Sequence, residues 1–239
     1  MDQRQLNLCI DAGNTRMKFG VFCQSELLCS GTGMPELEKA VSHYVISRAI
    51  ICSVAETEAI TAFLKQRKIP FVLLEQCGVP LEVNYETKAT LGADRLALAV
   101  GAAFAFPGKN VLVVACGSCI TYNFVCNGRS FEGGAISPGV HMRLRAMHQF
   151  TARLPLLKLE DVADVLGKST PTSMLSGAVI GAAAEIDGMC ERYSNKFPDL
   201  MIIVTGGDAP LLAAHLKNSI FARPALLLEG LNGILNHHA

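Results

Sequence analysis

Two stretches of the chain share one pattern and align without a gap, and this internal repeat restricts the folds that the chain can adopt. Residues 8–22 read LCIDAGNTRMKFGVF, and residues 112–126 read LVVACGSCITYNFVC. Each stretch predicts an apolar strand, a turn that contains glycine and polar residues, and a second apolar strand. The copies differ at one chemically important position, because Asp11 of the first corresponds to Ala115 of the second. A duplicated strand-turn-strand unit predicts two related lobes.

The elements predicted around the two copies follow a similar order, in which a three-stranded meander leads into alternating helices and strands. We expect an α/β protein with an N-terminal lobe at residues 1–108 and a C-terminal lobe at residues 109–239. This plan resembles the acetate kinase, sugar kinase, Hsp70 and actin superfamily. The resemblance implies duplicated RNase H-like domains, each a mixed five-stranded sheet with flanking helices, and an interdomain nucleotide cleft.

The individual elements are predicted from apolar periodicity and from the positions of glycine and proline. Strands are predicted at 6–10, 17–22, 27–30, 49–54, 71–74, 110–115, 119–125, 129–135 and 201–205. Helices are predicted after Pro35, at 56–67, 90–106, 140–150 and 172–193, and near the C-terminus.

The composition is that of a globular protein with no electrostatic preference for polyanions. Hydrophobic residues make up 50% of the 239 residues, and the mean hydropathy is +0.33, which supplies apolar material for a substantial core. Lys+Arg and Asp+Glu balance at 21 each, so no net field attracts nucleic acid or an anionic membrane. No apolar run reaches the roughly 18 residues of a spanning helix. We expect a soluble cytoplasmic protein.

Two groups of reactive or charged residues are interpreted as structural. Cys116 and Cys119 form a CxxC, but no second CxxC or HxxxH completes a metal site, and the pair lies in a strand-turn-strand. Reduced cysteine is the favoured state of all nine. The predicted helix at 140–150 carries Arg143, Arg145 and His148 between apolar residues, which favours a solvated face over a ligand site.

The two turns of the repeat have the chemistry of phosphate-binding loops. Gly13 and Gly117 allow a tight bend in which successive N–H groups point at one phosphate. Asn14, Thr15 and Ser118 add short donors, and Lys18 adds a point charge. Asp11 has the ligand chemistry for a hydrated Mg²⁺.

Neither turn identifies a nucleotide site by itself. An isolated D-x-G-N-T is also typical of an Asx-type hairpin turn, and it is the pairing of Gly13 with Gly117 that favours phosphate binding. A third loop, Thr205-Gly206-Gly207, lies between a predicted strand and a helix. That context suits the ribose or adenine of a nucleotide.

Gly92-Ala93-Asp94-Arg95 places two charges at the start of an otherwise apolar helix. One interpretation is structural, with Asp94 favoured by the helix dipole and paired with Arg95. The other is catalytic: Asp94 accepts a hydroxyl proton or holds that hydroxyl in line with a γ-phosphate, while Arg95 binds an anionic group of the substrate. The two interpretations are compatible.

The combination of these motifs resembles one kinase family over nearly the whole chain. DAGNTRMKFG (11–20), YETKATLGADR (85–95), FEGGAISPGV (131–140) with FTARLP (150–155), TSMLSG (172–177) and VTGGD (204–208) follow the order and spacing of type III pantothenate kinases. Members of that family transfer the γ-phosphate of ATP to pantothenate, giving 4′-phosphopantothenate in the first step of coenzyme A biosynthesis. The resemblance also implies Mg²⁺, a monovalent cation (K⁺ or NH₄⁺) and a homodimer.

The resemblance implies a role for each matching position. The ATP-binding positions are Asp11, Ala12, Gly13, Asn14, Thr15, Arg16, Met17, Lys18, Gly117, Ser118, Thr205, Gly206 and Gly207. The pantothenate-binding positions are Tyr85, Gly92, Ala93, Asp94, Arg95 and Thr172, the last across the dimer interface. Asp94 matches the catalytic aspartate, and Asp11 matches the residue that holds Mg²⁺ through water.

Ala115 departs from the family pattern. The second loop of the family reads D-x-G-T, and its aspartate is associated with the monovalent cation, whereas this chain reads Ala115-Cys116-Gly117-Ser118. Alanine offers no ligand beyond its backbone carbonyl, so we predict a weakened or absent K⁺ site with ATP binding retained. Two other hypotheses stay open: a catalytically weakened nucleotide-binding regulatory protein, and a kinase for another small hydroxy acid.

Overall fold

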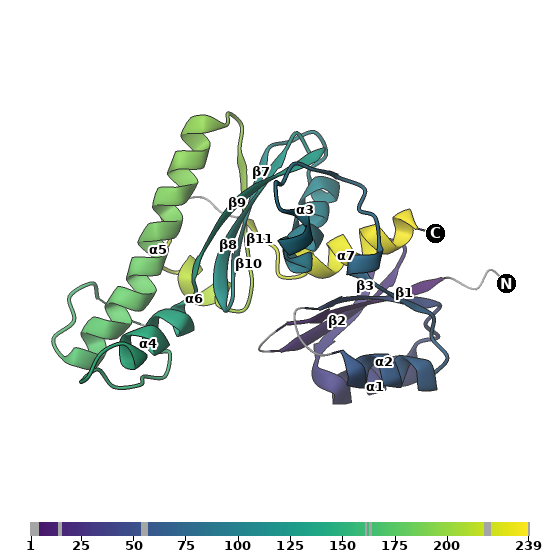
Figure 1. The fold of residues 1–239 in the computed structure, drawn as a ribbon, viewed down its shortest axis with the longest axis horizontal. Helices are drawn as coiled ribbons and strands as arrows, with labels where there is room; N and C mark the ends of the chain where they lie inside the picture. The colour runs from purple at the N-terminus through teal and green to yellow at the C-terminus, as the bar shows by residue number, and fades with distance from the viewer. Residues whose placement is uncertain are drawn as a thin grey trace. The chain divides into compact units, whose positions relative to one another are not determined.

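The computed structural model describes residues 5–13, 16–53, 57–160, 162, 164–217 and 221–238, and the chain divides into two compact units (Figure 1). The first unit comprises residues 1–108, 125–132 and 225–239. The second comprises residues 109–124 and 133–224. The C-terminal segment therefore groups with the N-terminal part of the chain. Within the described residues, no helix has the length and apolarity needed to cross a membrane.

The first unit contains a mixed five-stranded sheet, as predicted. Its strands are β1 (Leu6–Ala12), β2 (Met17–Cys23), β3 (Glu26–Thr32), β4 (Arg48–Ser53) and β5 (Phe71–Leu73), in the order β3-β2-β1-β4-β5. β2 is antiparallel to β1 and β3, and β4 is parallel to β1 and β5. The meander and the parallel extension thus meet at β1.

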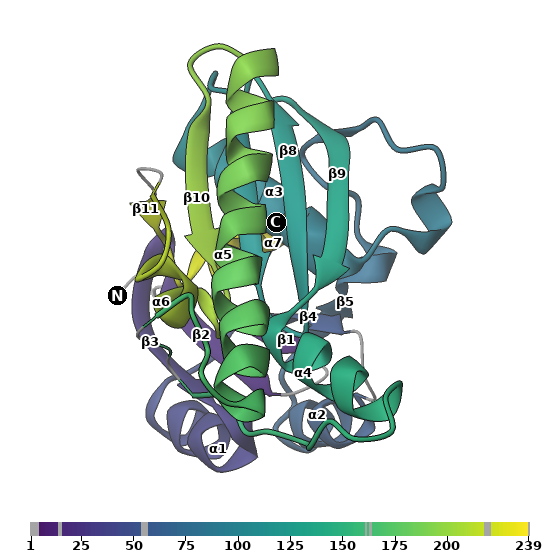
Figure 2. The ribbon, with the colours of Figure 1, turned by 90° about the vertical axis from the view of Figure 1, so that its left-hand side faces the viewer.

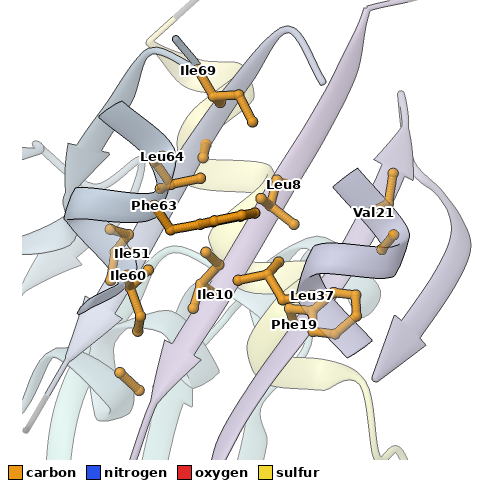
Figure 3. Close-up of a cluster of buried hydrophobic side chains, with 13 residues drawn as sticks. Leu8, Ile10, Phe19, Val21, Leu37, Ile51, Ile60, Phe63, Leu64 and Ile69 are labelled. Carbon is orange, nitrogen blue, oxygen red and sulfur yellow. The ribbon is translucent and has the colours of Figure 1, made fainter. Parts of the chain in front are cut away.

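Helices cover both faces of this sheet. Leu8 and Ile10 of β1 face a core that α1 (Gly33–His43) and α2 (Glu58–Gln66) close with Leu37 and Leu64 (Figure 3). Cys9, between them in sequence, faces a second core, because successive side chains of a strand point to opposite faces. That core is closed by α3 (Ala93–Ala105) and α7 (Leu226–His237). Two-sided burial explains why the strand sequences are nearly continuous apolar runs.

The second sheet repeats the first and adds one strand. Its strands are β7 (Val111–Cys116), β8 (Cys119–Cys126), β9 (Ser130–Pro138), β10 (Met201–Thr205), β11 (Phe221–Ala222) and β6 (Glu82–Val83), in the order β11-β10-β7-β8-β9-β6. From β9 to β11 this order matches β3-β2-β1-β4-β5, which confirms the duplication. This sheet has one strand more than the five predicted. The additional strand is β6, which pairs with β9 through only two residues and has no sequence pattern.

The long helix α5 (Thr170–Lys196) lies along the second sheet, as Figure 2 shows. Ser169 caps it: its hydroxyl accepts a hydrogen bond from the backbone N–H of Thr172, which is one half of a capping box. The other helices of the second unit are α4 (Val140–Gln149) and the short α6 (Ala209–Ala213). Two 3₁₀ turns, Leu74–Gln76 and Lys88–Thr90, lie in the first unit.

A network of amide side chains docks α7 onto the first sheet. The side-chain amide of Asn7 donates to the side-chain oxygens of Asn232 and Asn236, at 2.7 Å each. Arg48 donates to Asn7 and Asn236, at 3.0 Å each. Asn232 in turn donates to the backbone carbonyl of Gln24 at 2.7 Å. These bonds satisfy polar groups that would otherwise be costly to bury.

Candidate active site

The first glycine turn lies between β1 and β2. The antiparallel register places Asp11 opposite Lys18 and Ala12 opposite Met17, where the paired strands end. A Cβ on Gly13 would lie 3.2 Å from the carbonyl oxygen of Arg16, tighter than most such contacts. Asn14 and Thr15, two of the predicted ATP-binding residues, lie outside the described residues.

Asp11 is a half-buried carboxylate with a perturbed acidity. Its pKa is raised to about 6, because burial, together with the nearby Asp94, outweighs the opposing effect of Lys18. The two carboxylates are therefore close enough to repel each other. A pair of this kind favours a bound cation, because Mg²⁺ prefers carboxylate and phosphate oxygens.

The neighbouring strand places a buried thiol beside these carboxylates. Cys52 of β4 is paired with Asp11 in the parallel register and has no exposed surface. Burial raises the pKa of its thiol, and Asp11 and Asp94 raise it further. The thiol is therefore neutral at physiological pH and contributes no charge to the site.

Asp94 lies in the first turn of α3, after Gly92 at the N-cap. A Cβ on Gly92 would clash with the Oδ1 of Asp94, so a side chain at this position would displace the carboxylate. The helix N-terminus favours a negative charge there. The structural interpretation of Asp94 is thus compatible with its electrostatic contact with Asp11.

Arg95 is held by two aromatic rings. Only 4% of this residue is exposed, and its guanidinium carbon lies 5.7 Å from the ring centroid of Tyr85 and 5.5 Å from that of Phe131. The pairing of Val83 with Phe131 brings the two rings to 6.0 Å from each other. Phe131 was missed from the sequence as a neighbour of Arg95; its place in the FEGGAISPGV motif was the one available signal.

The second glycine turn follows β7 and is packed against the start of α4. The Gly117 N–H donates to the carbonyl of Cys119 at 3.0 Å, and the Gly139 N–H donates to the carbonyl of Ser118 at 3.1 Å. A Cβ on Gly139 would clash with the carbonyl oxygen of Gly117. Gly139 therefore packs directly against the turn, at a position that requires glycine.

The third glycine loop lies beside the second. β10 is parallel to β7, and Thr205 is paired with Ala115, so the loops that follow the two strands emerge at the same edge of the sheet. The Asp208 N–H donates to the carbonyl of Cys116 at 3.0 Å. Gly206 has φ +103°, and a Cβ there would clash with Cys116. The structure thus brings Gly117, Ser118, Thr205, Gly206 and Gly207 into one area of the second unit.

Thr172 has a local structural task. Its hydroxyl accepts hydrogen bonds from the backbone N–H groups of Lys168 and Ser169, at 3.0 and 2.9 Å. The residue is exposed at the N-terminus of α5. Its role in binding substrate stays a prediction.

A solvated face for Arg143 was a wrong prediction, because this residue forms an ion pair with Glu185 of α5. Glu185 also accepts hydrogen bonds from Tyr122 and Ser137. Sequence reasoning missed Glu185, because its partners lie 42 to 63 positions away. Arg145 and His148 are exposed, as predicted.

Comparison with known proteins identifies the family of these motifs. The family model described as type III pantothenate kinase matches residues 7–192. A protein from Flavobacterium psychrophilum named type III pantothenate kinase is 40% identical over 238 residues, which cover 96% of this chain and 98% of that protein. A protein of the same name from Bacteroides fragilis is 39% identical over 239 residues, covering 98% of each chain.

Solved structures show the same fold at low sequence identity. A Campylobacter jejuni protein described as a Baf family transcriptional activator is 21% identical, with a TM-score of 0.64, and the match covers 97% of this chain and 98% of that one. A ROK family protein from Streptococcus pneumoniae is 13% identical, with a TM-score of 0.52, covering 98% and 99%. These matches confirm the predicted superfamily fold.

Proposed function

The chain belongs to the type III pantothenate kinase family, and we propose that it transfers the γ-phosphoryl group of ATP to pantothenate. The product is 4′-phosphopantothenate, and the reaction is the first step of coenzyme A biosynthesis. One structural observation carries the proposal: Asp11 and Asp94 lie within electrostatic range of each other in the first unit. Such a reaction needs one carboxylate that holds Mg²⁺ and another that acts on the attacking hydroxyl.

Each glycine loop supplies groups suited to one part of the nucleotide. Backbone N–H groups at 11–18 and the short donor of Ser118 bind phosphate oxygens, Gly117 shapes the second turn, and Thr205-Gly206-Gly207 binds the nucleoside. Asp11 holds Mg²⁺ through water, a role that fits its half-buried carboxylate beside Lys18 and Asp94. Bound Mg²⁺ supplies positive charge that neutralises the phosphate oxygens during transfer.

The acceptor is bound at the start of α3. Asp94 accepts the proton of the attacking hydroxyl or orients that hydroxyl toward the γ-phosphate. Arg95, fixed between Tyr85 and Phe131, binds the pantothenate carboxylate. Gly92 and Ala93 line this position, and Thr172 of a second copy completes it.

Three further properties belong to the proposal. The protein is a cytoplasmic homodimer in which each copy contributes Thr172 to the acceptor site of the other. It has no membrane or nucleic-acid partner, which is consistent with its balanced charge. Its monovalent-cation site is weakened, because Ala115 carries no carboxylate.

A coupled assay of the purified chain with ATP, Mg²⁺ and a panel of small hydroxy acids tests the proposal. We expect pantothenate to be the preferred acceptor, with labelled pantothenate converted to a phosphorylated product. Turnover with a different hydroxy acid would overturn the choice of acceptor. Nucleotide binding without transfer to any acceptor would overturn the assignment as a kinase.

A further inference from the structure

Glu185 of α5 is contacted by three donors from three different elements of the second unit. The Tyr122 hydroxyl of β8 donates to its Oε1 at 3.0 Å, and the Ser137 hydroxyl of β9 donates to the same atom at 2.5 Å. Arg143 of α4 forms an ion pair with its Oε2. A single carboxylate thus joins two strands and two helices.

The charge state of the network is well defined. Burial raises the pKa of Glu185, but the hydrogen bonds from Ser137, Arg143 and Tyr122 together lower it below its ordinary value. Burial and the neighbouring Glu185 raise the pKa of Tyr122, so its phenol remains protonated and donates. Glu185 is therefore an anion that only accepts, and its three partners only donate to it.

The network also fixes the backbone that leads into α4. Arg143 donates through its Nε to the carbonyl of Pro138 at 2.9 Å, in addition to its pair with Glu185. Ser137 is held from the other side by Glu185. Ser137 is therefore bound to the Glu185 carboxylate directly, and Pro138 is linked to it through the guanidinium of Arg143.

Gly139, the next residue along the chain, packs against the second glycine turn. Gly139 donates from its N–H to the carbonyl of Ser118 at 3.1 Å, and its Cα lies too close to the Gly117 carbonyl to carry a Cβ. A displacement of Gly139 must therefore be transmitted to residues 117 and 118, because no space separates the two backbones.

We propose that Glu185 is a positioning residue for the Gly117-Ser118 loop, acting through Ser137, Arg143 and Gly139. The inference rests on the proposed function in one respect, namely that this loop binds phosphate. A loop binds an anion well only when its donors already point at it. Without Glu185, residues 137–139 are no longer held against the loop. Nucleotide binding then weakens, although Glu185 does not contact the nucleotide.

Glu185→Gln is the first variant to test, because it retains the shape and an acceptor oxygen but removes the charge that pairs with Arg143. Calorimetric titration with a non-hydrolysable ATP analogue and Mg²⁺ measures the Kd. We expect the Kd to rise about ten-fold, within the range by which residues that do not contact a ligand alter its binding, with the KM for pantothenate within about two-fold of wild type. Glu191→Gln is the matched control, on the same helix and exposed, and should leave the Kd unchanged.

Arg143→Lys keeps the charge but cannot bridge Glu185 and Pro138 with one planar group, so it should also raise the Kd. If the variants act through one network, the double variant should bind the analogue about as weakly as the weaker single variant. This second series decides the question if Glu185→Gln does not fold.

A lowered Tm together with a wild-type Kd in Glu185→Gln or Arg143→Lys would overturn the proposal and make the network a stabilising ion pair only. The titration contains no acceptor, so it is independent of the acceptor assignment. If wild type binds the analogue but does not phosphorylate pantothenate, the proposed function fails, and the Kd values still decide the role of Glu185.

Discussion

Asp11 lies directly opposite Lys18 in the pairing of β1 with β2, and the cation offsets part of the cost of burying the carboxylate. It does not offset all of it, because burial and the neighbouring Asp94 leave the pKa of Asp11 at about 6. The fold therefore holds the Asp11 carboxylate near a second acidic group and does not fully stabilise its charge. A site of this kind is arranged for a cation that comes with the substrate.

The first prediction concerns the low-pH side of the pH–rate profile. Because the pKa of Asp11 is about 6 in the free enzyme, kcat/KM for ATP should fall as the pH is lowered through about 6, where the carboxylate takes up a proton. Steady-state rates at saturating pantothenate and varied pH measure this. An acid limb centred near the ordinary value of 3.8 would contradict it.

Asp11→Asn is the control for this prediction. It also tests whether the buried charge of Asp11 destabilises the folded protein. A folded-state pKa above the unfolded value favours folding at low pH, and that contribution is lost as the pH rises through about 6. The difference between 3.8 and about 6 corresponds to about 3 kcal/mol as an upper bound. Asp11→Asn should therefore be more stable than wild type at neutral pH and less active, and an equal or lower free energy of unfolding would contradict the burial argument.

The second prediction is that Asp94→Asn lowers kcat. Proton acceptance and orientation by one side chain typically contribute about 10²–10⁴-fold, and asparagine keeps the shape but cannot accept the proton. Binding of the ATP analogue should change little. A kcat within a few-fold of wild type would leave Asp94 with its structural role at the helix N-terminus alone.

Most of the regular structure could be predicted from the sequence, because both sheets are buried on two faces and their strands are short apolar runs between glycine, proline and polar residues. β10 matches its predicted range, Met201–Thr205. β6 could not be predicted, since two residues carry no periodicity. The neighbours of Arg95 and Glu185 depend on pairings between distant segments, such as Val83 with Phe131, and no local pattern encodes them.

The third prediction concerns the monovalent cation. Ala115 lies near the end of β7, opposite Thr205, and offers only its carbonyl as a ligand, so K⁺ should activate weakly. Loss of one charged interaction of this kind weakens cation binding about ten- to a hundred-fold. Titration of K⁺ at constant ionic strength measures it, and Ala115→Asp should increase the dependence on K⁺. Strong, saturable activation of wild type at low concentration would mean that another group replaces the carboxylate.

The fourth prediction concerns acceptor recognition. Phe131→Leu removes one of the two rings that hold Arg95. Cation–π contacts of buried guanidinium groups contribute about 1–2 kcal/mol, so the KM for pantothenate should rise about five- to thirty-fold while the KM for ATP stays unchanged. An acceptor analogue in which an alcohol replaces the carboxylate should be affected much less, because Arg95 acts on the charge.

Phe22→Leu is the matched control for this prediction. Phe22 is equally buried in the first unit but packs in the core closed by α3 and α7, a cluster that includes neither of the two rings around Arg95. It should lower the free energy of unfolding to a similar extent without raising the KM for pantothenate. Equal changes of KM in both variants would show that Phe131 acts through stability alone.

The fifth prediction concerns the amide network that docks α7. Asn232 is buried, with 4% of its surface exposed, and it bonds to Asn7 and to the carbonyl of Gln24. Asn232→Ala removes one acceptor of the Asn7 amide and the donor to the Gln24 carbonyl, which should cost about 1–3 kcal/mol of unfolding free energy. Asn236→Ala removes an exposed member of the same network, where water can replace the lost bonds, so its cost should be smaller. Urea unfolding of both variants measures the difference, and equal costs would mean that burial of Asn232 does not determine how strongly α7 is held.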